Sequence, residues 1–245
     1  MTAAIEAVRA DREALLGICA GLSPAEWQLG SGCEGWSVQD VVSHLAALFW
    51  GMVEPTRLPD VTGLPTERAQ EAWVVARRGL SPEEVAADYA DVSARALERL
   101  GQLAVLDFKV PLGDLGTYPA AVLPSAFAFD HYTHIRADLF QPRGPLAGPP
   151  PPSDELRVGS ALDWIDAALP QQNPAAAEAG TYELQVTGPV TRIISFGSGQ
   201  AMATVSSEAD AFIRWVTQRA SWEELGVHAA GDEPALSAAR KLKVF

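Results

Sequence analysis

Three of the four histidines fall at two places that could together bind one divalent metal ion. His134 follows Asp130 by four residues, so on a helix both side chains project from one face about one turn apart. A carboxylate and an imidazole at this spacing can hold one cation, and His44 from another helix can complete a set of three protein ligands. Three ligands leave a coordination position for water or substrate, which is typical of a catalytic metal.

The residues around His44 predict an amphipathic helix. Ser37 and Asp40 form a sequence typical of a capping box, which begins a helix. Apolar residues then recur at helical spacing over about residues 38–52. His44 lies at the edge of this apolar stripe, so its ring is expected to face the protein interior.

A second helix, over about residues 119–140, is expected to carry the other two candidate ligands. Asp130 and His134 continue the stripe of its apolar residues, so both are directed toward the core. A carboxylate carried inward without a partner is costly or becomes protonated. A bound metal removes that cost.

Other roles are open for these residues. Asp130 and His134 can form only a hydrogen-bonded pair within one helix, and His44 can be a half-buried core residue. His131 is a rival ligand, because it precedes His134 by three residues. Asp138 extends the stripe by one turn, where it is either a hydrogen-bond partner that fixes the ring of His134 or a surface acid.

The composition favours a folded, acidic protein. Apolar residues make up 48% of the 245 residues, charged residues 20%, and the formal net charge is −13. An acidic surface repels phosphate backbones, which argues against a nucleic-acid partner. No run approaches the roughly 18 apolar residues of a membrane span, and no secretory signal is recognisable. We therefore expect a cytoplasmic protein in which Cys19 and Cys33 are reduced thiols.

A proline-rich linker at residues 147–152 divides the chain into two predicted domains. The first, 1–146, has helical periodicity. The second, 153–245, combines helices with alternating segments that predict strands, at 181–187, 190–196 and 200–206. The glycine-rich residues 197–199 predict a hairpin between the last two strands. The expected fold is therefore a helical domain followed by a smaller α+β domain.

The segment around His44 resembles a known family. Residues 35–45 are similar to the first motif of the mycothiol-dependent maleylpyruvate isomerase N-terminal domain: a Trp, then Ser or Thr, an acid three residues further on, and a His followed by Leu or Ile. Residues 130–134 are similar to the second motif, in which three residues separate an acid or His from a His. The resemblance implies a DinB-like four-helix bundle over 1–146 and a sterol-carrier-like α+β domain over 153–245.

The resemblance also implies ligands. In the family the corresponding residues bind a divalent metal, usually zinc, so His44, Asp130 and His134 inherit this role. The isomerase itself has Glu where this chain has Asp130. Because Asp is one methylene shorter, the helix must lie closer to the metal or a water must intervene.

The family uses the metal with a low-molecular-weight thiol such as mycothiol, which implies an isomerase or a thiol transferase. Trp36 and Trp50 flank the predicted helix of His44 and are candidates to line the thiol-binding pocket. The family uses an arginine of its second domain in catalysis, for which Arg214 and Arg219 are candidates. Arg136 is expected on the outer side of its helix.

Two other functions are compatible with the sequence. The second domain could bind an apolar ligand without catalysis, with the helical domain as a scaffold or regulator. A metal-dependent hydrolase could instead use water in place of a thiol. For the enzyme, the expected partners are a small-molecule substrate and the thiol, and the expected assembly is a monomer or a homodimer.

Overall fold

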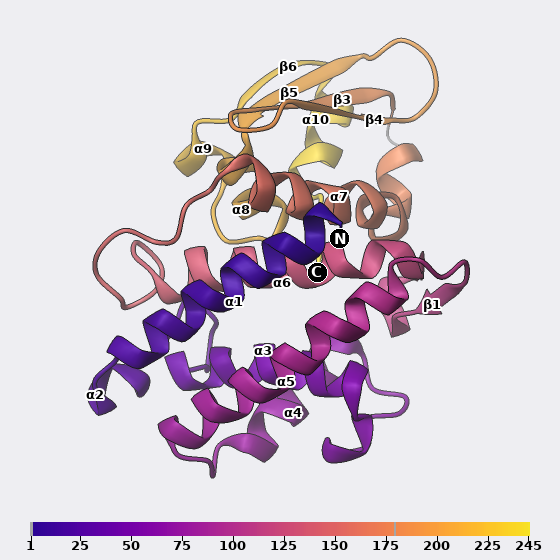
Figure 1. Ribbon diagram of the computed structural model, residues 1–245. Helices are drawn as coiled ribbons and strands as arrows, with labels where there is room; N and C mark the ends of the chain where they lie inside the picture. The colour runs from indigo at the N-terminus through magenta and orange to yellow at the C-terminus, as the bar shows by residue number, and fades with distance from the viewer. Residues whose placement is uncertain (1, 179) are drawn as a thin grey trace. The chain divides into compact units, whose positions relative to one another are not determined.

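The computed structural model describes residues 2–178 and 180–245. The chain divides into two compact units, with the boundary between Pro152 and Ser153. Each unit is described by itself (Figure 1). The first is helical and the second combines helices with a small sheet, which confirms the predicted mixture of structural classes. No helix among the described residues is long and apolar enough to cross a bilayer.

Four long helices make up most of the first unit: α1 (Ala3–Gly21), α3 (Val38–Val53), α5 (Pro82–Leu103) and α6 (Leu123–Thr133). α3 packs against α5, and α1 packs against both α5 and α6. Two further helices are α2 (Pro24–Trp27), a single turn, and α4 (Thr66–Arg77), which is about as long as α6. The remaining elements are a two-stranded hairpin of β1 (Lys109–Pro111) and β2 (Thr117–Pro119), and the 3₁₀ turns η1 (Pro55–Arg57), η2 (Gly113–Leu115) and η3 (Ala120–Val122).

The predicted capping box at the start of α3 is present. The Ser37 side chain accepts a hydrogen bond from the Asp40 backbone N–H at 3.1 Å, and the Asp40 carboxylate accepts one from the Ser37 backbone N–H at 3.0 Å. Two donors that a helix start leaves unpaired are thereby satisfied. This fixes the first turn of α3 and, with it, the direction in which His44 points.

The helix predicted over residues 119–140 is present as a continuous helical segment over 120–139, but its turns change in type along its length. It consists of η3, α6 and then η4 (His134–Leu139), a segment of wider π-helical turns. Such turns are rare and occur often at functional sites, because they redirect the side chains that follow. Every residue of η4 is buried.

The second unit contains a four-stranded sheet in the order β4-β3-β5-β6. Its strands are β3 (Tyr182–Thr187), β4 (Arg192–Phe196), β5 (Ala203–Glu208) and β6 (His228–Gly231). Its helices are α7 (Glu155–Gln172), α8 (Ala209–Val216), α9 (Trp222–Leu225) and α10 (Glu233–Arg240), with a 3₁₀ segment η5 (Pro174–Glu178). The alternation predicted in β3 is confirmed, since Tyr182, Leu184 and Val186 are buried.

The predicted hairpin between β4 and β5 is wrong. β4 pairs antiparallel with β3, whereas β5 pairs parallel with the opposite edge of β3. Glycines at 197 and 199 allow the chain to turn, but they do not decide which strand it joins. The order of the strands in the sheet follows from pairing between apolar strands that are distant in the sequence. A local turn sequence does not determine that pairing.

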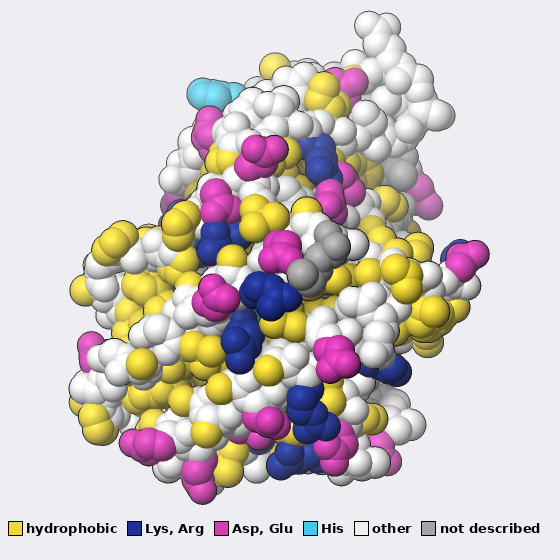
Figure 2. Space-filling view, in the orientation of Figure 1, with side chains coloured by type: hydrophobic (Ala, Val, Ile, Leu, Met, Phe, Trp, Pro, Cys, Tyr) yellow, Lys and Arg dark blue, Asp and Glu magenta, His cyan; other side chains and the backbone are white. Residues whose placement is uncertain are grey.

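On the face drawn in Figure 2, acidic and basic side chains lie close to one another among apolar ones. Over the whole chain acidic residues outnumber basic ones by 31 to 18.

Candidate metal centre

The structure brings together the three residues that the sequence singled out as metal ligands. His44 comes from α3, Asp130 from α6, and His134 from the start of η4. Donor atoms of the three side chains all lie within 4.8 Å of one another. The imidazole centroids of His44 and His134 are 4.8 Å apart, and His134 Nε2 lies 3.9 Å from Asp130 Oδ1.

The three side chains differ in their access to solvent. His44 is 1% exposed, and 11% of the His134 side chain is exposed, against 27% of the Asp130 side chain. The two imidazoles therefore form the interior of the cluster. Asp130 is the most exposed of the three.

Asp138 orients the ring of His134. Its carboxylate is completely buried, and its Oδ2 atom lies 2.8 Å from His134 Nδ1. Of the two roles that the sequence left open for Asp138, the structure therefore has the hydrogen-bond partner and not the surface acid. A carboxylate can only accept, so the proton lies on Nδ1, and the lone pair of the neutral ring lies on Nε2, the nitrogen nearer Asp130.

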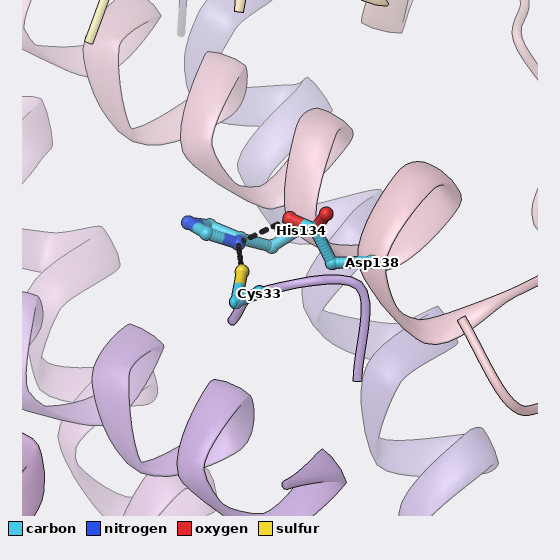
Figure 3. A group of neighbouring side chains, drawn as sticks. All are labelled: Cys33, His134 and Asp138. Carbon is cyan, nitrogen blue, oxygen red and sulfur yellow. Dashed lines mark hydrogen bonds and ion pairs between the residues drawn. The ribbon is translucent and has the colours of Figure 1, made fainter. Parts of the chain in front are cut away.

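A thiol also contacts this ring. Cys33 Sγ lies 3.6 Å from the same Nδ1 atom of His134 (Figure 3). Burial by itself lowers the pKa of His134, but the Coulombic interaction with Cys33 and the hydrogen bond to Asp138 outweigh it and raise the pKa to about 10. Without a metal, His134 is therefore protonated at neutral pH.

Cys33 is the neighbour of His134 that the sequence indicated least clearly. Its place just before the His44 helix indicates only that it could reach the mouth of the site. The close approach depends on Gly32, where an added Cβ would lie 2.9 Å from the Asp138 Cα. Spacing cannot reveal such a contact, because Cys33 and His134 are 101 residues apart.

Of the two tryptophans predicted to line a thiol pocket, the structure brings one to the cluster. The Trp36 ring lies 5.1 Å from the His44 ring and 6.4 Å from the His134 ring, measured between centroids. Its indole N–H donates to Glu71 at 2.6 Å, which fixes the ring.

Trp50 is not brought to the cluster. It follows His44 by six residues, which places it about 120° around α3 from His44. It is 1% exposed, its N–H donates to Asp88 of α5 at 2.9 Å, and the guanidinium of Arg57 lies 3.9 Å from its ring centroid. These contacts are those of a core anchor.

His131, the rival ligand, has other partners. Its Nδ1 donates to the Phe127 carbonyl at 2.8 Å, so in the neutral ring Nε2 accepts from the Tyr89 hydroxyl at 2.9 Å. Burial lowers the pKa of His131 to about 4, which keeps the ring neutral. Both nitrogens are used within the core.

The expectation that Arg136 lies on the outer side of its helix is wrong. Its side chain is 4% exposed and forms a two-point ion pair with Asp11 of α1, at 2.9 and 3.0 Å. It also donates to the Pro152 carbonyl at 2.8 Å. The sequence could not indicate this, because the compensating acid lies 125 residues away.

The candidate catalytic arginines belong to the second unit. Arg214 lies in the last turn of α8, and Arg219 follows that helix, where its guanidinium donates to the Thr217 carbonyl at 3.3 Å. Both are half-buried. Their roles stay predictions.

Fold and site together define a class: two-unit proteins whose helical unit gathers two histidines and a carboxylate, followed by an α+β unit. The model of one family, the mycothiol maleylpyruvate isomerase N-terminal domain, matches residues 8–134, more than half of the chain. The chain belongs to this family.

Two solved structures have the same fold over both units. The crystal structure of the mycothiol-dependent maleylpyruvate isomerase has a TM-score of 0.63 at 17% identity. That of a histidine-to-alanine mutant of this isomerase has a TM-score of 0.61 at 16% identity. Each alignment covers 95% of this chain and 94% of the other. No curated protein matches the chain.

Proposed function

We propose that the chain is a metal- and thiol-dependent enzyme, a maleylpyruvate isomerase-like isomerase or a thiol transferase. A divalent cation, zinc by its donor set, would be held by His44, Asp130 and His134. The cofactor or co-substrate would be mycothiol or a similar thiol. The observation that carries the proposal is the convergence of these three side chains within 4.8 Å inside a domain of this family.

The distances fit one ion with a small adjustment. Nitrogen and oxygen ligands at about 2.0–2.2 Å from a tetrahedral zinc lie about 3.4 Å apart. His134 Nε2 and Asp130 Oδ1 are 3.9 Å apart, which is wider by about half an ångström. The isomerase has Glu where this chain has Asp130. Because Asp is shorter, its carboxylate is expected to lie further from the other ligands, as observed. A rotation of the half-exposed Asp130 side chain can close this gap.

The bound cation would supply positive charge that lowers the pKa of a thiol, so that the nucleophilic thiolate forms near neutral pH. The protein's own residues prepare the site. Asp138 keeps the proton of His134 on Nδ1 and directs Nε2 toward Asp130. Trp36 provides an aromatic wall beside both imidazoles, which limits the access of water.

A thiolate can catalyse cis–trans isomerisation by reversible addition. Its addition to a conjugated cis double bond leaves a single bond that can rotate. Loss of the thiol then gives the trans isomer. An anionic substrate needs a counter-charge, which we assign to Arg214 or Arg219. We also infer that the second domain, which carries both arginines, is sterol-carrier-like and that the first domain is a DinB-like bundle. We place the protein in the cytoplasm, where low-molecular-weight thiols stay reduced.

Metal analysis of the purified protein tests the proposal. We expect about one divalent ion per chain in the wild type and loss of the ion in both His44→Gln and His134→Gln. His228→Gln is the matched control, because His228 is exposed on β6 of the second unit. A wild type without stoichiometric metal, or retention of the ion by both site variants, would contradict the proposal.

A thiol requirement separates the proposal from its alternatives. We expect isomerisation of a maleylpyruvate-like cis acid only when mycothiol or a similar thiol is added. Hydrolysis of esters or amides without thiol would instead indicate a metal hydrolase. Ligand-dependent stabilisation without any turnover would indicate a binding protein.

A further inference from the structure

A second set of donor atoms surrounds the other edge of His134. Cys33 Sγ lies 3.6 Å and Asp138 Oδ2 lies 2.8 Å from Nδ1. Ligand atoms of the three residues lie within 4.8 Å of one another. Figure 3 shows both side chains approaching the same nitrogen, while the second ring nitrogen points away from them.

The backbone holds Cys33 in this position. Gly32 donates its backbone N–H to the Asp138 carbonyl at 2.8 Å, and its lack of a side chain permits this approach. The Ser31 hydroxyl accepts from the Cys33 backbone N–H at 3.1 Å and donates to the Trp36 carbonyl at 2.9 Å. The sulfur is thus presented to the ring by a hydrogen-bonded turn.

The sulfur-to-nitrogen distance matches that of two ligands on one ion. With zinc bonds of about 2.3 Å to sulfur and 2.0–2.1 Å to nitrogen, the two ligand atoms of a tetrahedral zinc ion lie about 3.6 Å apart. The observed separation is 3.6 Å. The Asp138 oxygen is closer than such a geometry requires, by about half an ångström, so it would move slightly outward when an ion replaces the proton. A thiolate in the set favours soft ions.

We propose that Cys33, His134 through Nδ1, and Asp138 form a second cation position, which binds thiophilic divalent ions such as Cd²⁺. A neutral imidazole has one lone pair. An ion on Nδ1 leaves the ring proton on Nε2, the nitrogen that faces Asp130. The two positions therefore compete for His134, and a soft ion on the Cys33 side removes His134 from the set formed with His44 and Asp130.

Cadmium titration of the metal-free full-length protein tests this inference. Coordination by sulfur produces an ultraviolet charge-transfer band. We expect this band to grow to one Cd²⁺ per chain in the wild type and to be lost in Cys33→Ser. Because the chain has two cysteines, Cys19→Ser is the matched control. Cys19 is buried in α1 and should leave the band unchanged.

Two further variants separate this inference from the proposed enzyme. His44→Gln should keep the band, because His44 belongs only to the first set. Asp138→Asn should shift the titration midpoint to higher Cd²⁺ concentration. The inference is overturned by a wild type without the band, by an undiminished band in a Cys33→Ser protein, or by loss of the band in His44→Gln. Circular dichroism of each variant confirms that it is folded, and none of these readouts depends on thiol-dependent turnover.

Discussion

Zinc binding should release a proton from His134 well above neutral pH. The pKa of this ring is raised to about 10, so at pH 8 nearly every metal-free molecule carries the extra proton. An unperturbed histidine, with a pKa of about 6.5, would be almost fully neutral there. Because a metal ligand must give up this proton, we expect His134 to contribute about one released proton per zinc ion at pH 8, against almost none for an ordinary histidine.

The same pKa sets the size of the pH effect on affinity. At pH 7, about three units below the pKa, proton removal costs about 4 kcal/mol, at roughly 1.36 kcal/mol per unit. The apparent zinc affinity should therefore rise about tenfold per pH unit between pH 6.5 and 9. The metal-free protein has the opposite dependence. A raised pKa gives stability that is complete below the unfolded value of about 6.5 and is lost as the pH rises through about 10.

Isothermal titration calorimetry in two buffers of different ionisation enthalpy measures the released protons, and chelator competition measures the affinity. Cys33→Ser and Asp138→Asn should both reduce proton release at pH 8, because these two neighbours raise the pKa. His228→Gln should not. Release near zero in the wild type at pH 8, with an affinity that is flat from pH 7 to 9, would refute the assignment of His134 as a protonated ligand.

Three further predictions follow from buried contacts. Asp138→Asn should weaken zinc affinity by about 10–100-fold in chelator competition, because the ring loses its charged acceptor; an unchanged affinity would contradict this. Asp11→Ala should lower the free energy of unfolding in urea by about 3–5 kcal/mol, because it leaves the charge of Arg136 buried without its acid. A loss below about 1 kcal/mol would place this pair among weak surface ion pairs. In the native protein, iodoacetamide should label half-buried Cys33 but not Cys19, whose pKa burial raises to about 12; mass spectrometry of the peptides reads this out, and equal labelling would contradict it.

Sequence predicted the parts of the site that local rules determine. The start of α3 follows from the reciprocal hydrogen bonds of Ser37 and Asp40, and the position of His44 follows from helical spacing. The neighbouring faces of Asp130 and His134 follow from the same spacing. Spacing alone could not bring His44 to the other two, because it does not determine how separate helices pack. The family motifs supplied that part.

Contacts between distant segments could not be predicted in the same way. From the sequence, Arg136 is expected at the surface. In the structure it is buried, because Asp11 of α1 lies opposite it and compensates its charge. The parallel pairing of β3 with β5 depends on which strand edges meet. Cys33 contacts His134 only because Gly32 allows two backbones to approach. Each outcome is decided by packing across the fold, for which the local sequence has no signal.

Ionisable residues form a stripe along α6 and η4, and this stripe places a different carboxylate beside each ring nitrogen of His134. Asp130, His134 and Asp138 follow one another at intervals of four residues, so a carboxylate flanks the imidazole on each side. The buried Asp138 lies 2.8 Å from Nδ1, whereas the half-exposed Asp130 lies 3.9 Å from Nε2. A short bond in the interior fixes a proton, and a longer gap beside solvent leaves room for a cation. In the proposed site the difference in burial separates two chemically identical side chains: Asp138 would hold the ring proton and Asp130 would contact the cation.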